Sequence, residues 1–259
     1  MRKMPFHLVD ASPWPFFMSL SLFSFITNLV MMMNLKYFNF FFSVLIMITI
    51  MFLWFRDITR ESTYLGFHSS EVQNNILLGM IWFILSEIFF FLGIFWSFLH
   101  SSLSSSVDYF LNWPPTGIIV VNPLGVPLLN TALLLSSGFS VTWSHYSILN
   151  SSFNESFLGL VITILLGVLF TLIQYLEYLN SFFSISSSCY GSCFFLGTGF
   201  HGMHVIIGTS LLMGCLFRFF LGHFNMNNHI GFECSIWYWH FVDVVWIFLF
   251  LVIYCWGSM

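Results

Sequence analysis

Charged side chains are scarce in this chain of 259 residues, because Lys, Arg, Asp and Glu together make up only 6% of it. A typical soluble domain has roughly 25% charged residues, so too few remain here to cover a water-facing surface. The net charge of −4 leaves no basic patch for a nucleic-acid backbone. The composition excludes a soluble enzyme and a nucleic-acid-binding protein.

Cysteine patterns typical of disulfide frameworks or zinc sites are also missing. The sequence has no CxxC pair and no Cys/His zinc spacing. We interpret the cysteines as small buried hydrophobic residues, which excludes a disulfide-stapled secreted domain. The five are Cys189, Cys193, Cys215, Cys234 and Cys255.

Apolar residues are abundant instead: 58% of the chain is hydrophobic and 36 residues are Phe. A helix needs about 20 mainly apolar residues to cross the hydrocarbon core of a membrane. Runs of that kind predict an all-α polytopic membrane protein, a single domain over 1–259 with seven transmembrane helices. We expect them at about 14–33, 38–55, 76–99, 128–148, 157–176, 193–220 and 236–256.

The basic residues indicate an orientation. Only Lys36 falls on the side opposite the N-terminus, and the positive-inside rule therefore places the N-terminus in the cytoplasm or the mitochondrial matrix. The five on the N-terminal side are Arg2, Lys3, Arg56, Arg60 and Arg218.

Glu87 lies deep in a predicted helix, in the run SEIFFFLG, with no basic residue in that helix. A charged carboxylate at this depth costs several kcal/mol, so we expect Glu87 to be buried and protonated at neutral pH. Two interpretations stay open. Glu87 is either a proton-exchanging or conformational carboxyl, or a neutral acid that donates one hydrogen bond to a neighbouring helix.

Two further pairs are spaced three residues apart on helices, which places each pair on one helical face. Asp243 and His240 form either a structural polar pair or a proton relay. His201 and His204 share a stripe with small residues that permit close helix packing. A metal on these two histidines would need further ligands, so we predict no metal site on this chain.

A basic cluster follows the second predicted helix. Arginine suits bidentate phosphate recognition, so the cluster is either a lipid-headgroup site or a topology anchor with internal ion pairs. Arg218 lies at the equivalent depth after the sixth helix. The cluster comprises Arg56, Asp57, Arg60 and Glu61, with His68 and Glu71 nearby.

Eight blocks, in order and over nearly the whole chain, resemble cytochrome c oxidase subunit III. They are SPWP at 12–15, FRDITREST at 55–63, GMIWFILSEIFFF at 79–91, FWSFLHSSL at 95–103, WPPTG at 113–117, VPLLNT at 126–131, GFHGMHVIIG at 199–208 and GFECSIWYWHFVDVVW at 231–246.

This resemblance implies a non-catalytic core subunit of the terminal respiratory oxidase in the mitochondrial inner membrane, with its N-terminus in the matrix and its C-terminus in the intermembrane space. Haem and copper are then expected on partner subunits and none on this chain. The chain would pack against the catalytic haem–copper subunit I, within a larger respiratory supercomplex, and support its assembly, stability and proton uptake. A V-shaped cleft filled with phospholipid would separate helices one and two from helices three to seven.

The resemblance also implies roles for single residues. Glu87 matches the membrane-embedded carboxylate of the family, and His7 falls near the side where protons enter. The positions that match lipid-headgroup contacts are Arg56, Arg60, Glu61, His68 and Arg218.

Three other functions are alternatives to this one. A retinal pump needs a lysine in its last helix, and no lysine follows Lys36. A secondary transporter typically shows an inverted repeat and paired broken helices, and neither is visible, although Glu87 keeps this alternative open. A catalytic oxidase subunit would need several separated histidine ligands for haem and copper, which the histidine pairs do not supply.

Overall fold

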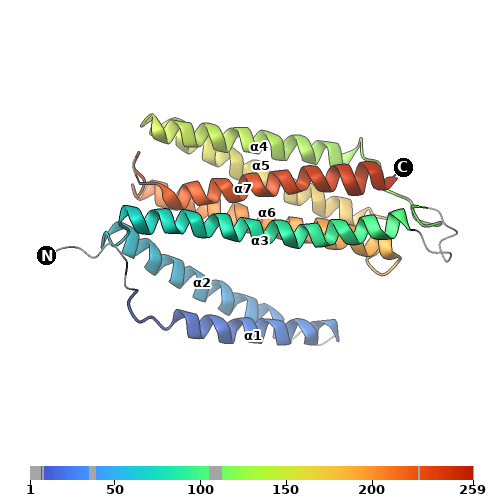
Figure 1. The fold of residues 1–259 in the computed structure, drawn as a ribbon, viewed down its shortest axis with the longest axis horizontal. Coiled ribbons are helices and arrows are strands. Elements are labelled where there is room, and N and C mark those ends of the chain that lie inside the picture. The colour runs from blue at the N-terminus through green and yellow to red at the C-terminus, as the bar shows by residue number, and fades with distance from the viewer. Residues whose placement is uncertain (1–6, 8, 35–38, 105–112, 227, 259) are drawn as a thin grey trace. The chain divides into compact units, whose positions relative to one another are not determined.

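The computed structural model describes residues 7, 9–34, 39–104, 113–226 and 228–258. Seven helices within these residues are long and apolar enough to cross a membrane, which confirms the predicted class. They are α1 (Trp14–Met33), α2 (Phe40–Thr63), α3 (Ser70–Leu103), α4 (Val126–Leu149), α5 (Phe153–Leu179), α6 (Cys189–Phe220) and α7 (Ile230–Leu249). A π-helical segment η2 (Phe250–Cys255) continues α7, and a 3-10 turn η3 (Trp256–Ser258) follows it (Figure 1).

Most helices extend beyond their predicted ends. The helix α2 continues through FRDITREST to Thr63, α5 reaches Leu179, and α7 already begins at Ile230. A scan for apolar runs stops at the first polar residues, whereas a helix can continue beyond the hydrocarbon core into the interfacial region. Arg2, Lys3 and Lys36, on which the predicted orientation partly depends, lie outside the described residues.

The chain divides into two compact units, 1–76 and 77–259. The predicted division lay between the second and third helices, whereas the observed one falls inside α3, so its first turns group with α1 and α2. The lipid-filled cleft expected between two groups of helices stays a prediction.

In the first unit, α1 packs against α2 (Figure 1). The buried residue of each helix is a serine, Ser21 in α1 and Ser43 in α2. Each hydroxyl donates to a backbone carbonyl three residues earlier, Ser21 to Met18 and Ser43 to Phe40, which satisfies the polar group within its own helix. Small residues such as these are typical of close helix pairs in membranes.

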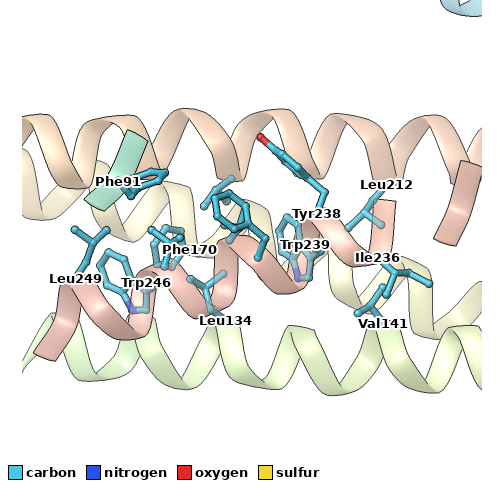
Figure 2. Packing of buried hydrophobic residues seen from close by; sticks show 14 of the residues in the cluster. Phe91, Leu134, Val141, Phe170, Leu212, Ile236, Tyr238, Trp239, Trp246 and Leu249 are labelled. Carbon is cyan, nitrogen blue, oxygen red and sulfur yellow. The ribbon is translucent and has the colours of Figure 1, made fainter. Parts of the chain in front are cut away.

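In the second unit, α7 contacts both α4 and α6, and α5 contacts both α4 and α6. Figure 2 shows Trp239 and Trp246 of α7 in the interior of this bundle, where both are almost fully buried. The indole nitrogen of Trp239 donates to Oγ of Ser137 in α4 at 2.9 Å. A Cβ atom on Gly208 of α6 would lie only 2.9 Å from the Trp239 ring, so the glycine creates the space for this packing. The small residues predicted to permit close packing on the α6 stripe do so here.

Candidate functional sites in the two units

Glu87 of α3 faces His204 of α6, with Oε2 of the carboxyl 3.0 Å from Nε2 of the imidazole. Nδ1 of His204 lies 2.7 Å from the carbonyl oxygen of Phe200, which can only accept, so Nδ1 is the donor there. In a neutral ring Nε2 is then an acceptor. The contact with Glu87 therefore requires one further proton, either on the carboxyl or on the imidazole.

The surroundings of Glu87 differ from those expected from the sequence. Its side chain is 23% exposed, so it is half-buried rather than buried, because α3 contributes few residues to the core of the second unit. A second helix, α6, also supplies a titratable partner, His204. Phe91 packs edge-on against the His204 ring and covers one side of the pair.

His201 does not pair with His204, although the spacing placed both on one face. Its ring is buried, with Nε2 3.2 Å from the carbonyl oxygen of Val242 in α7, and it packs against Phe170 and Trp246. Nδ1 of His201 has no hydrogen-bond partner among the described residues. His201 thus contacts α7, whereas His204 contacts Glu87 of α3, and the two rings do not converge on one point.

Asp243 and His240 share a face of α7, with Oδ2 3.9 Å from Nδ1, which is within ion-pair reach but longer than a hydrogen bond. Asp243 is buried, whereas the His240 side chain is 40% exposed. A Cβ on Gly138 of α4 would lie 2.8 Å from Oδ2 of Asp243. The carboxyl therefore points at the backbone of α4, and that glycine accommodates it.

The basic cluster of the first unit is partly neutralised by its own acid. Arg56 donates from Nε and Nη2 to Oδ1 of Asp57, at 3.1 and 3.0 Å. The indole of Trp14 in α1 donates to the other oxygen of Asp57 at 2.6 Å, which ties α1 to α2. Arg60, by contrast, is exposed, and its side chain forms no ion pair with any described residue.

Arg60 lines a hollow of about 320 Å³ within the first unit. The apolar residues Trp54, Ile58 and Leu65 contribute to its wall, together with the segment 9–14 that leads into α1. Three carboxyl groups, those of Asp10, Asp57 and Glu61, also line the hollow. The hollow therefore combines the guanidinium of Arg60 with apolar and acidic walls.

His7, Glu61 and His68 come together at the same end of the first unit. Nε2 of His7 lies 3.1 Å from Oε2 of Glu61, and its ring stacks on Phe67. The ring centroids of His7 and His68 are 5.9 Å apart. Glu61 and His68 were predicted to share a cluster and a lipid-headgroup role, whereas the approach of His7 to them was not predicted.

Arg218 belongs to the second unit and is half-buried at the end of α6. Its guanidinium carbon lies 4.6 Å from the centre of the Phe224 ring, a cation–π contact. Its Nε is buried without a hydrogen-bond partner among the described residues, and a Cβ on Gly231 would collide with the guanidinium. Arg218 thus packs against its own chain, and the role in lipid binding that the resemblance implies stays a prediction.

A buried polar network around Glu177 was missed, because the predicted fifth helix ended at residue 176. Tyr254 of η2 donates to Oε1 of Glu177 at 2.6 Å. Asn130 of α4 donates to Gln174 of α5 at 3.1 Å, and Gln174 lies 3.4 Å from both Glu177 and Tyr254. The spacing of Gln174 and Glu177, three residues apart on a helix, was the signal that could have found it.

Comparison with known proteins places the chain in a family. The sequence model of the family described as cytochrome c oxidase subunit III matches residues 4–258. Cytochrome c oxidase subunit 3 of Myxine glutinosa is 52% identical over 255 residues, which cover 98% of this chain and 97% of the relative. The protein of the same name from Prototheca wickerhamii is 50% identical over the full length of both chains, and that from Drosophila yakuba is 48% identical over 98% of this chain and 97% of the relative. The chain therefore belongs to the cytochrome c oxidase subunit III family.

Proposed function

We propose that this core subunit of cytochrome c oxidase holds phospholipid headgroups at the end of α2 and supports proton uptake by the catalytic haem–copper subunit I through the Glu87–His204 pair. The chain supplies no redox centre of its own. The observation that supports the lipid part is the exposed Arg60, which forms no ion pair among the described residues and lines a hollow with apolar and acidic walls.

Arg60 fits a phosphodiester for three reasons. A guanidinium binds two phosphate oxygens at once, and membrane headgroups supply the ligand at high local concentration. Trp14 and Trp54 beside the hollow are amphipathic rings of the kind enriched at the membrane interface. Arg56 is less available, because its guanidinium already donates to Asp57.

Lipid retention in the purified oxidase tests this assignment. We expect Arg60→Gln to lower the phospholipid phosphorus retained per haem after a detergent wash. The matched control is Arg56→Gln, which removes the same charge one turn earlier and is expected to lose less lipid. Equal lipid content in wild type and Arg60→Gln would contradict the proposal.

The Glu87–His204 pair suits a proton-exchanging role because its hydrogen bond needs a proton that either group can hold. Such a pair passes a proton across 3.0 Å without rearranging the helices. The family carries no metal centres, so the pair would act on oxygen reduction only indirectly. The alternative of a purely structural neutral acid is distinguished by the Glu87→Gln experiment in the Discussion.

We also propose a membrane and an orientation for the chain. The chain is a multi-pass membrane protein, and its mitochondrial relatives imply the inner membrane. We place the N-terminus in the matrix and the C-terminus in the intermembrane space, since five of the six basic residues fall on the N-terminal side. Protease protection of a C-terminal tag in intact mitoplasts, whose outer membrane is removed, would contradict this orientation.

A further inference from the structure

We propose that His7, Glu61 and His68 form a binding site for a divalent cation of the Zn²⁺ type, taken up from solution. Each residue offers one ligand atom, and the three atoms lie within 4.8 Å of one another. All three residues belong to the first unit and are half-buried. The site is separate from the histidines of α6, and it departs from our prediction from the sequence that this chain has no metal site.

The geometry is close to that of a zinc site with an open position. Zinc binds imidazole nitrogen and carboxylate oxygen at about 2.0–2.2 Å in a tetrahedron, which separates neighbouring ligand atoms by roughly 3.3 Å. Nε2 of His7 and Oε2 of Glu61 are already 3.1 Å apart. A small shift of the His68 side chain closes the triangle, and water then completes the fourth position.

The donor set selects the class of ion. Two imidazole nitrogens and one carboxylate oxygen suit Zn²⁺ and its transition-metal neighbours, whereas Mg²⁺ and Ca²⁺ prefer shells made of oxygen alone. The neighbouring Arg60 carries a positive charge that opposes cation binding, so the ion is exchangeable rather than a permanent centre of the subunit.

The ligands come from three separate segments of the chain. His7 precedes α1, Glu61 lies in the last turn of α2, and His68 lies in the connection to α3. Phe67 stacks on the His7 ring at a centroid distance of 5.3 Å and orients it toward Glu61. An ion bound here therefore joins the segment before α1 to the end of α2.

The site is tested by measuring the binding of exchangeable zinc to the whole purified oxidase. After treatment with a chelator, wild type and variants are dialysed against radioactive ⁶⁵Zn²⁺ with excess Mg²⁺. We expect His7→Gln, Glu61→Gln and His68→Gln each to weaken binding of one zinc per oxidase by at least about tenfold. The control His100→Gln, an exposed histidine at the far end of α3, is expected to bind as wild type does.

Further outcomes distinguish this site from the lipid site and from nonspecific electrostatic binding of cations. Arg60→Gln is expected to keep the zinc or bind it more tightly, even where it loses lipid. Unchanged binding in both histidine variants, or displacement of the zinc by Mg²⁺, would overturn the proposal. If a variant fails to assemble, as judged by its haem content, a map of the wild-type oxidase soaked with Cd²⁺ decides: density between the three side chains supports the site, and its absence refutes it.

Discussion

The hydroxyl of Tyr254 donates a hydrogen bond of 2.6 Å to Oε1 of Glu177, joining the end of α7 to the end of α5. Both side chains are buried, and Oε2 of Glu177 has no partner among the described residues. Tyr254 lies in the π-helical segment η2, where the helix departs from its usual hydrogen-bond pattern. Segments of this kind are frequent at functional sites, and here a tyrosine within one donates a short hydrogen bond to a buried acid.

Removal of the Tyr254 hydroxyl is expected to destabilise the subunit. Tyr254→Phe keeps the ring but leaves the buried carboxyl of Glu177 with only the longer hydrogen bond from Gln174. The expected loss in the free energy of unfolding is about 1–3 kcal/mol. Thermal unfolding of the chain in the purified oxidase, followed by thiol labelling of its buried cysteines, measures the effect. Tyr175→Phe is the control, since Tyr175 of α5 is 60% exposed, and an equal shift in both variants would contradict the role of the hydrogen bond.

Glu87→Gln is expected to leave oxygen reduction and assembly near the wild-type level while slowing proton uptake and shortening activity under sustained turnover. Glutamine retains a hydrogen bond to Nε2 of His204 but holds no transferable proton. A double-mutant cycle with His204→Gln is expected to show a coupling of about 0.5–3 kcal/mol in the free energy of unfolding. Loss of oxygen reduction itself would contradict a non-catalytic subunit, and unchanged proton uptake would favour the structural interpretation.

Gly208→Ala is expected to destabilise the second unit by about 1–3 kcal/mol, because the new methyl group would overpack against Trp239. Gly202→Ala is the matched control in the same helix, since nothing lies within 4 Å of its added Cβ. That control is expected to be neutral or slightly stabilising, by less than about 1 kcal/mol. Equal thermal stability of the two variants would show that α6 and α7 do not approach as closely as described.

The separated subunit is expected to contain no stoichiometric haem or copper. His201 and His204 contact Val242 and Glu87 and do not converge, so they provide no ligand set for either group. Metal analysis and visible absorption spectra of the chain, after it is dissociated from the other oxidase subunits, provide the measurement. Haem or copper in a one-to-one ratio with the chain would refute this prediction.

The seven helices could be predicted from the sequence because apolar runs of membrane-spanning length are a strong signal. Their ends were less certain: Glu177 was placed outside a helix because the apolar run ended one residue before it. The π-helical segment around Tyr254 could not be predicted, since FLVIYC differs little from the apolar helix before it.

The residues of the candidate sites could be predicted from the sequence, but the residues that they contact could not. Glu87 was recognised from its depth in a helix, yet its contact with His204 joins positions 117 residues apart and depends on how α3 and α6 pack. The approach of His7 to Glu61 likewise depends on the path of the chain before α1. Spacing along one helix identifies a shared face, and it contains no information about which other helix supplies the contact.

The position of α7 at the interior of its bundle has a consequence for membrane insertion. Among the helices of the second unit α7 is the most buried, and its Trp239 donates a hydrogen bond to the Ser137 hydroxyl in α4. It is also the last of these helices along the chain. Because α7 follows α4, α5 and α6 along the chain, we expect the bundle to close only after α7 has entered the bilayer.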